Sequence, residues 1–309
     1  MRSLFVVLVC GAALVAAAAA GGPAVGGGEA GWVAESSGTE NPLIGIWGRA
    51  GTLFAVGPKG TILRRDGKVW TPIPVDSTPH LTSVWGASER GLFVTGDGGL
   101  ILRREGEGWT RMESGTAVNL DSVWGSSESD VFAVGDSDGV ILHHDGKGWA
   151  RMESGTKQGL FCVWGAGPND VFAVGIGGTI LHYDGKAWSP MESGTTEHFM
   201  GVWGASAGDV FAVGTGGTIV HYDGKAWSSM VSGTSRNLTR VSGSGGRDVF
   251  AVGMEGTVLH YDGAVWKPMA AATEAGLYNV WVTSSSEAFA VGTGGTILRY
   301  DGPRRAPTR

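Results

Sequence analysis

Short apolar runs separated by glycine-rich turns recur along most of the chain. In the stretch 160–195 the runs are 160–164, 171–174, 179–183 and 187–191. Each has the length and the Val, Ile, Phe, Trp and Thr content of a β-strand, and the clusters between them are typical of turns. The pattern predicts four short antiparallel strands, the last two joined by a hairpin at Asp184-Gly185 of the kind that needs positive φ.

The same unit repeats with a period of about 39 residues, and three columns of aromatic residues mark it. The centre of a Val-Trp-Gly phrase falls on Trp47, Trp85, Trp124, Trp164, Trp203, Ser242 and Trp281. A second column is Trp32, Trp70, Trp109, Trp149, Trp188, Trp227 and Trp266, and a third is Phe54, Phe93, Phe132, Phe172, Phe211, Phe250 and Phe289. The first two columns contain all 13 tryptophans, so none is left over for stacking on a sugar.

Runs such as Val-Phe-Ala-Val do not alternate, which predicts a sheet buried on both faces. Such sheets are covered by stacking face to face around an axis, as in a β-propeller. A solenoid would cover them as well, but it needs capping ends. The two ends of this chain complete each other instead: the last unit, 277–302, has three strands, and residues 31–38 have the spacing of the missing fourth.

The sequence therefore predicts an all-β fold, a seven-bladed β-propeller of four-stranded antiparallel blades over residues 31–302. The N-terminal strand completes the last blade and closes the ring. Closure also pairs the edges that an open array would expose.

The segments outside the repeat have other signatures. Residues 1–20 combine Arg2, an uncharged apolar run and the small residues Ala18 and Ala20, which is typical of a cleavable secretory signal peptide. The alternative is an uncleaved membrane anchor. We interpret 21–30 as a Gly-rich linker and 303–309 as a C-terminal tail. We expect a secreted or periplasmic, cell-envelope protein that is a monomer and does not insert into the membrane after cleavage.

Composition narrows the classes of partner. The chain has 55 glycines in 309 residues and a net charge of -6, without a long basic run, which argues against nucleic acid and anionic membranes as partners. Only Cys162 remains after removal of the signal peptide, so no intramolecular disulfide forms, and we expect a buried thiol.

The phrases Leu-x-x-Val-Trp-Gly, Asp-Val-Phe-Ala-Val-Gly and Ser-Gly-Thr resemble BNR/Asp-box-like propeller repeats. The Ala-Val-Gly-x-x-Gly-x-Ile strands are most similar to photosystem II assembly factor-like propellers, and the resemblance covers 31–302. It implies a fold shared by sialidases, other glycosidases and assembly factors. The Asp-box itself has a hydroxyl residue where His182 stands, and one more residue between Asp184 and Gly185, which weakens any transfer of glycosidase activity.

No residues have the pattern of a catalytic site. The acids after the third strand recur once per unit, as a fold requirement does: Asp66, Glu105, Asp145, Asp184, Asp223, Asp262 and Asp301. Four tyrosines share one column, leaving Tyr278 as the exception, and the arginines form no evident cluster. We expect a protein without catalytic residues or cofactors. The alternative is an Asp-box-type glycan-active enzyme or a lectin.

Two residue patterns could be mistaken for metal-binding sites. The histidine column, His143, His182, His221 and His260, shares its position with Arg64, Arg103 and Arg299. Equivalent positions on seven blades diverge radially, so we expect each cation to pair with its neighbouring turn acid. The lengthened turn at Asp136 and Asp138 offers carboxylates for weak Ca²⁺ binding, but short acidic turns are ordinary, and we expect no metal site.

Loop positions that differ from repeat to repeat are the best candidates for binding a ligand, because the scaffold does not constrain them. The turns after the second strand and the Ser-Gly-Thr connections should share one rim. Unit six is the least regular, with Ser242 in place of tryptophan and Met254-Glu255 in place of turn glycines. The candidate ligand-facing residues are His80, Asn119, Gln158, His198, Arg236, Arg240 and Glu255. We expect a secreted, non-catalytic scaffold that binds or assembles a protein or glycan at the cell envelope.

Overall fold

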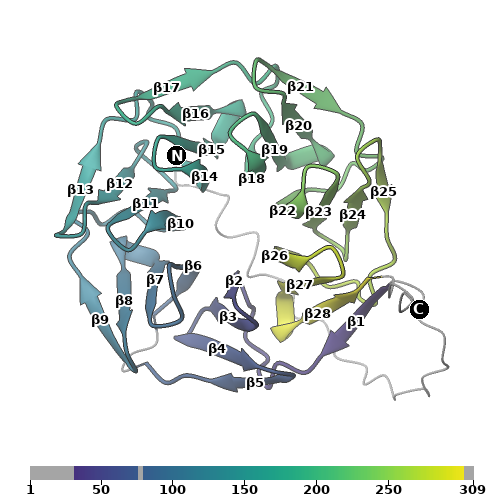
Figure 1. Ribbon diagram of the computed structural model, residues 1–309, viewed down its shortest axis with the longest axis horizontal. Coiled ribbons are helices and arrows are strands. Elements are labelled where there is room, and N and C mark those ends of the chain that lie inside the picture. The colour runs from purple at the N-terminus through teal and green to yellow at the C-terminus, as the bar shows by residue number, and fades with distance from the viewer. Residues whose placement is uncertain (1–30, 76–78, 303–309) are drawn as a thin grey trace, which may run out of the picture.

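The computed structural model describes residues 31–75 and 79–302. They form seven four-stranded antiparallel sheets arranged as blades around a central channel (Figure 1). In blades 1 to 6 the four strands follow chain order from the axis outwards, which confirms the predicted propeller. The signal peptide, linker and tail predicted for 1–20, 21–30 and 303–309 lie outside the described residues. Among the residues described, no helix is long and apolar enough to span a membrane.

The strands of blades 1 to 3 come first in the chain. Blade 1 consists of β2 (Gly45–Arg49), β3 (Thr52–Gly57), β4 (Thr61–Asp66) and β5 (Val69–Pro72). Blade 2 consists of β6 (Leu81–Gly86), β7 (Gly91–Gly96), β8 (Ile101–Glu105) and β9 (Gly108–Met112). Blade 3 consists of β10 (Leu120–Ser127), β11 (Asp130–Gly135), β12 (Ile141–His144) and β13 (Trp149–Met152).

Blades 4 to 7 follow the same plan. Blade 4 consists of β14 (Leu160–Gly167), β15 (Asp170–Gly175), β16 (Ile180–Tyr183) and β17 (Trp188–Met191). Blade 5 consists of β18 (Phe199–Ser206), β19 (Asp209–Gly214), β20 (Ile219–Tyr222) and β21 (Trp227–Met230). Blade 6 consists of β22 (Leu238–Gly245), β23 (Asp248–Gly253), β24 (Val258–Tyr261) and β25 (Trp266–Pro268). Blade 7 consists of β26 (Leu277–Ser284), β27 (Glu287–Gly292), β28 (Ile297–Asp301) and β1 (Gly31–Glu35).

Single 3₁₀ turns connect the second and third strands of four blades. They are η2 (Asp97–Gly99), η3 (Ile176–Gly178), η4 (Thr215–Gly217) and η5 (Thr293–Gly295). The predicted hairpin after the third strand is also present: Gly185 has a φ of +88°, and the Asp184 carboxylate accepts hydrogen bonds of 2.9 Å from two backbone amides that follow it. This explains why the Asp-Gly pair recurs.

The first strand of a blade is longer than the sequence pattern predicts. Strand β14 continues to Gly167 instead of ending at Trp164, and its pairing with β15 shifts register twice, once between Leu160 and Cys162. A β-bulge inserts one extra residue into a strand and turns its side chain away from the regular alternation. Apolar periodicity does not reveal such a residue, so the bulge is known only from the structure.

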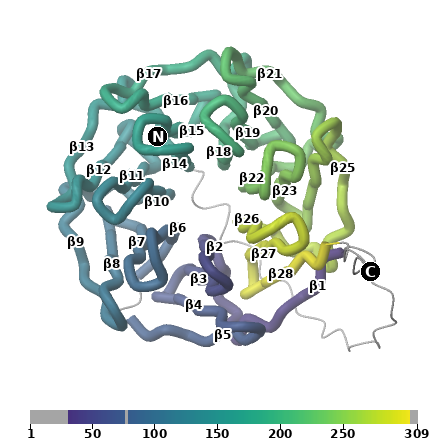
Figure 2. Tube along the Cα trace, in the orientation of Figure 1, coloured from purple at the N-terminus to yellow at the C-terminus, as the bar shows by residue number. Residues whose placement is uncertain are grey.

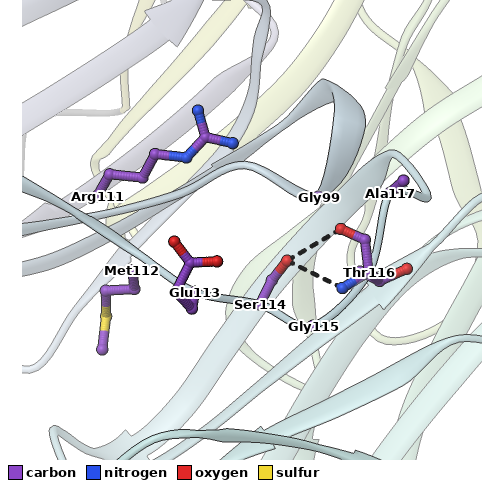
Figure 3. A pocket seen from close by; sticks show the side chains of 8 residues that line it. All are labelled: Gly99, Arg111, Met112, Glu113, Ser114, Gly115, Thr116 and Ala117. Atoms are coloured by element: carbon purple, nitrogen blue, oxygen red, sulfur yellow. Dashed lines mark hydrogen bonds between the residues drawn. The ribbon is translucent and has the colours of Figure 1, made fainter.

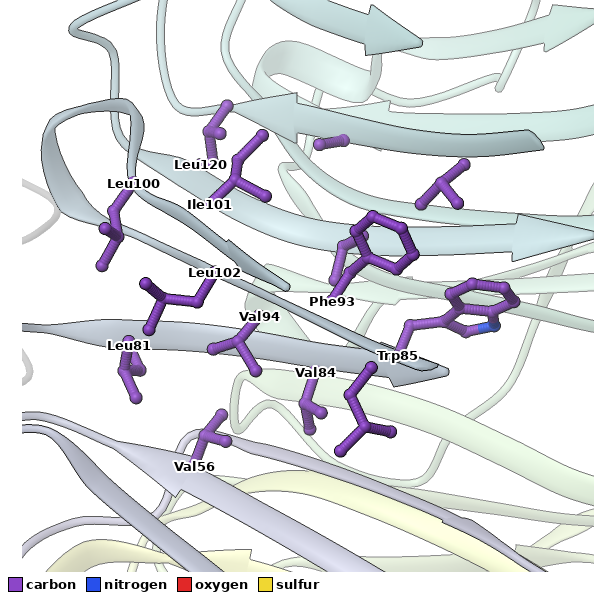
Figure 4. Packing of buried hydrophobic residues seen from close by; sticks show 14 of the residues in the cluster. Val56, Leu81, Val84, Trp85, Phe93, Val94, Leu100, Ile101, Leu102 and Leu120 are labelled. Atoms are coloured by element: carbon purple, nitrogen blue, oxygen red, sulfur yellow. The ribbon is translucent and has the colours of Figure 1, made fainter. Parts of the chain in front are cut away.

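Each blade packs on the next through the aromatic columns. Phe172 is almost completely buried and meets Trp227 of the following blade edge to face, with ring centroids 6.2 Å apart. Tyr222 packs on the same phenylalanine at 6.0 Å. The tyrosine column is therefore part of the scaffold. Figure 4 shows the same interlocking nearer the start of the chain, where Val56 of blade 1 and Leu120 of blade 3 flank the side chains of blade 2.

Close to the channel, the tryptophan of one blade lies against the glycine of the next. A Cβ atom on Gly165 would lie 2.5 Å from Trp124, and one on Gly204 would lie 2.7 Å from Trp164. Contacts between non-bonded carbon atoms are normally about 3.5–4.0 Å. The glycine of Val-Trp-Gly is therefore required by the indole of the preceding blade, which explains why the two residues repeat together.

Closure occurs as the sequence predicts. Strand β1 pairs with β28 in antiparallel register, with Trp32 opposite Tyr300, and the first and last described segments lie side by side (Figure 2). Trp32 is only 5% exposed. From the same strand, Glu35 accepts hydrogen bonds from Arg65 at 2.9 Å and from the Trp70 indole at 3.0 Å, so it ties the closing strand to blade 1.

The histidine column pairs differently from the expectation. The arginines Arg64 and Arg103 do contact their turn acids, at 3.1 and 3.2 Å. The histidines instead contact the aspartate that begins the second strand of their own blade, as His143 contacts Asp130 at 2.7 Å. The imidazole also packs on the adjacent phenylalanine in a tilted arrangement, with ring centroids 4.5 Å apart for His143 and Phe132. The prediction of turn-acid pairing was therefore wrong for the histidines.

Candidate functional site

One face of the ring carries the connections between blades together with the turns between second and third strands. We call this face the upper rim. Backbone amides of these turns donate hydrogen bonds to side chains of the next connection: Gly98 to Asn119 at 2.9 Å and Gly177 to His198 at 2.9 Å. The two sets of loops thus lie together, as the order of the strands requires.

Two of the predicted ligand-facing residues therefore have a structural role as well. Asn119 bridges blade 2 and blade 3, because its amide group also donates to Asp136 at 3.1 Å. His198 bridges blades 4 and 5 through the Gly177 amide. Asn237, the last residue of the connection before blade 6, accepts from Gly216 in the same way at 3.0 Å. All three immediately precede the first strand of a blade, and this shared position was the signal available in the sequence.

The other predicted rim residues are more open to solvent. Gln158 is exposed, and its backbone amide bonds the Thr156 hydroxyl at 3.0 Å. Arg236 and Glu255 form an ion pair of 2.8 Å, with side chains 52% and 68% exposed. Glu255 has a φ of +55°, in the region that usually favours glycine. Unit six is therefore irregular because the missing turn glycine is replaced by an acid that pairs across the rim.

His80 lies at the start of blade 2, where its Nδ1 atom is 3.0 Å from the Asp97 carboxylate. Its side chain is one-third exposed, so it contributes to the upper rim while it holds its own blade's turn. Arg240, by contrast, is on the inner strand β22, inside the ring of connections. Its guanidinium donates to the Met200 carbonyl of blade 5 at 2.7 Å. The structure thus separates Arg240 from the other six predicted residues.

Asp121 is a functional candidate that the sequence pattern does not single out. It is the bulged residue of β10, between Leu120 and Ser122, and it is half-buried. Burial, together with the negative charges of Asp136 and Asp97, raises the pKa of its carboxyl to about 8, although the positive charge of Arg240 acts in the opposite direction. Arg240 belongs to a blade three positions away in the ring, so this effect acts between blades that are not neighbours.

The lengthened acidic turn does not form a metal cage. The Asp136 carboxylate accepts from Asn119, and the Asp138 carbonyl accepts from the Arg151 guanidinium at 2.7 Å. Within 31–75 and 79–302, the side chains of His, Cys, Asp and Glu do not assemble into a group of three placed to hold an ion. Cys162 is a free, buried thiol.

Shallow depressions lie where the Ser-Gly-Thr connection passes the turn glycine. In blade 2, residues 111–117 and Gly99 line one of about 290 Å³, and Figure 3 shows Ser114 bonded to Thr116 along its floor. Blade 7 has an equivalent depression of about 400 Å³, lined by 35–40 and Gly295. Because the same motif lines both, these depressions belong to the repeat and not to a site unique to one blade.

Comparisons with known proteins bear on the fold. The chain matches no protein-family model and no curated protein in sequence. Among solved structures it is similar to YCF48 from Cyanidioschyzon merolae, with a TM-score of 0.72 and 18% identity over 88% of this chain and 98% of that one. It is also similar to YCF48 bound to D1 peptide, with a TM-score of 0.72 and 19% identity over 91% of this chain and 99% of that one. A third similar structure is the WD40 β-propeller domain of Doa1, with a TM-score of 0.76 and 12% identity over 89% of this chain and 98% of that one.

These identities show a common fold. The two YCF48 structures support, at that level, the resemblance to photosystem II assembly factor-like propellers. No Asp-box protein is among these three neighbours.

Proposed function

We propose that this propeller is a non-catalytic scaffold that binds a protein partner through its upper rim. The observation that carries the proposal is the likeness, over 91% of the chain, to a propeller whose structure holds a bound peptide, YCF48 with D1 peptide. A fold alone hosts many functions, so the residues of the rim must supply the remaining argument.

The upper rim differs from blade to blade more than the aromatic columns of the blade interfaces do. The phenylalanine and outer tryptophan columns occur in every blade, whereas the residues that precede each first strand include histidine, asparagine and glycine. The exposed ion pair between Arg236 and Glu255 adds a feature at the junction of blades 5 and 6. A surface on which each blade presents different groups around one mouth suits recognition of an irregular surface such as that of a protein.

The test compares two triple variants in affinity capture from a cell-envelope extract, with quantitative mass spectrometry of retained proteins. One carries Gln158→Ala, Arg236→Ala and Glu255→Ala on the upper rim. The matched control carries Lys147→Ala, Lys186→Ala and Lys225→Ala, which are exposed on the opposite face. We expect a protein retained by the wild type and the control but lost from the upper-rim variant. Equal retention by all three would assign binding to another surface.

The non-catalytic part of the proposal has its own test. The alternative, a glycan-active enzyme or lectin, predicts turnover of fluorogenic glycosides or retention on a glycan array. We expect neither. Hydrolysis that disappears in a Tyr278→Phe variant would replace the scaffold by an enzyme.

We also propose that residues 1–20 direct the protein out of the cytoplasm and are removed. Intact-mass measurement of the protein isolated from its native envelope fraction should give a chain that begins at Gly21. A mass that retains Met1, with the protein in the membrane fraction, would favour the anchor.

A further inference from the structure

We propose that His144 makes the junction between blades 2 and 3 sensitive to acid: the neutral imidazole holds the junction closed, and its protonation loosens it. The inference goes beyond the proposed function, because it does not depend on which surface binds a partner. Histidine is the side chain whose charge ordinarily changes between about pH 5 and 8.

His144 is the only buried histidine of the seven, all of which lie within the described residues, and 1% of it is exposed. It is the last residue of β12. Its ring packs against Phe93 of blade 2, with centroids 5.5 Å apart, and against Trp149 of its own blade at 5.3 Å. Phe93 belongs to the packing shown in Figure 4. A charge on His144 would therefore form inside the contact between two blades, where water cannot solvate it.

The hydrogen bonds of the two ring nitrogens require the neutral imidazole. The backbone amide of Gly146, which can only donate, bonds Nδ1 of His144 at 3.2 Å, so Nδ1 is unprotonated and Nε2 carries the proton. Nε2 is buried and, within 31–75 and 79–302, forms no hydrogen bond. Protonation would add a hydrogen to Nδ1 that points at the Gly146 N–H. The hydrogen bond within the hairpin between β12 and β13 would then be lost.

The equivalent positions of the other blades show how the fold accommodates charge there. Arg65 and Arg104 occupy the position in blades 1 and 2, and their guanidinium groups contact the carboxylates of Glu35 at 2.9 Å and Glu107 at 3.1 Å. In blades 4 to 7 the position is a tyrosine, which is neutral until high pH. These tyrosines are Tyr183, Tyr222, Tyr261 and Tyr300, each paired with the outer tryptophan of its blade as His144 is. Of these seven residues, His144 alone can gain a charge near neutral pH, and it has no carboxylate in contact.

The charged groups around His144 do not supply the missing partner. The Arg103 guanidinium of blade 2 lies over the same Phe93 ring, 5.5 Å from its centre, so protonation would place a second cation on that ring. The Glu128 carboxylate contacts Arg103 at 3.5 Å. The Asp145 carboxylate accepts hydrogen bonds from two backbone amides of its own turn. The acids of this region are therefore already engaged.

The balance of these effects lowers the pKa of His144 below its ordinary value of 6.5. Burial is the largest cause, followed by the positive charge of Arg103, and His143 acts weakly in the same direction. The Asp145 carboxylate and the Glu128 backbone carbonyl act in the opposite direction. A histidine whose pKa is lower in the folded than in the unfolded state destabilises the fold as the pH falls. The junction should therefore loosen progressively below the unfolded-state value of 6.5.

The experiment measures local opening of the full chain by amide hydrogen exchange at about pH 7.5 and about pH 5, corrected for the intrinsic pH dependence of exchange. The amides of β8 and β12 report on the junction, and those of β23 in blade 6 serve as an internal reference. His144→Tyr introduces the residue of blades 4 to 7. The matched control is His182→Gln, which removes a histidine that faces an aspartate, Asp170 at 3.3 Å.

We expect the opening equilibrium of β8 and β12 in the wild type to rise about tenfold or more on acidification, equivalent to about 1.4 kcal/mol, and that of β23 to rise less. His144→Tyr should abolish the difference, and His182→Gln should retain it. NMR titration of the wild-type histidines tests the same claim without a variant, and the midpoint of His144 should lie below 6.5. An equal rise in folded His144→Tyr, or a His144 midpoint at or above that value, would overturn the proposal.

Discussion

The backbone amide of Val282 donates a hydrogen bond to the side-chain oxygen of Ser242 across the junction of blades 6 and 7, at 3.4 Å. At the other junctions the chain has tryptophan in the position of Ser242 and glycine in the position of Val282. Since the indole excludes a Cβ atom on the facing glycine, the loss of one tryptophan and the gain of one valine are a matched exchange. The two departures from the repeat therefore face each other across one junction.

This exchange predicts strong coupling between the two positions. Ser242→Trp alone should destabilise the protein by about 1–3 kcal/mol, because the indole meets the Val282 side chain. Adding Val282→Gly should restore most of that loss, so that the double-mutant cycle gives a favourable interaction. Chemical denaturation of the four proteins measures the coupling. Additive effects would show that the two side chains do not share the space.

The closing strand predicts a second result. Glu35→Gln should lower the free energy of unfolding by about 3 kcal/mol, because Arg65, which is buried with it, would lose its countercharge. The matched control is Asp66→Asn, which removes an acid from the more exposed pair with Arg64 and should cost less than about 1 kcal/mol. Urea unfolding followed by tryptophan fluorescence measures both. Similar losses in the two variants would mean that Glu35 does not secure the ring.

Asp121 predicts an unusual dependence of stability on pH. Its pKa is about 8 in the fold, against 3.8 in an unfolded chain, so between these values the folded state holds the extra proton. Stability must then fall as the pH rises from about 4 to 8 through this group. Asp121→Asn should remove that slope and be more stable than the wild type at pH 8, by on the order of 2 kcal/mol. Parallel pH profiles of the two proteins would contradict the assignment.

The turn acids should behave in the opposite way. Backbone amides of Ala187 and Lys186 hold the pKa of Asp184 below its usual value, and those of Ala226 and Lys225 do the same for Asp223. These carboxylates stabilise the fold when ionised, and their contribution is lost as the pH falls through the lowered pKa. Carboxyl ¹³C NMR should give midpoints below 3.8 for both and far above it for Asp121. Midpoints at or above 3.8 would show that the turn hydrogen bonds do not persist in solution.

The repeat explains why so much of the fold was predictable. Trp32 could be assigned to the last blade because its distance to Gly38 matches the spacing in complete units. The aromatic columns identified the blade interfaces for the same reason. The direction of individual side chains could be predicted less well. His143 was expected to contact its turn acid, but it contacts Asp130 and packs on Phe132.

The candidate site, too, was predicted only in part. The loops of the upper rim followed from the order of strands, and six of the seven predicted residues lie there. The pairing of Arg236 with Glu255 and the bridges made by Asn119 and His198 depend on distances between blades, which spacing along the chain does not give.

The sequence by itself determined the all-β architecture and the seven-fold repeat, because both depend on apolar periodicity and turn residues within about 39 positions. It also determined closure, because residues 31–38 have the spacing of the strand that 277–302 lacks. Only the tertiary structure decided the environment of Asp121. Its pKa reflects charges on blades 2, 3 and 6, which a closed ring brings within electrostatic range of Asp121 although they are far apart along the chain. Local patterns determine strands and turns, whereas electrostatic interactions depend on distances through space.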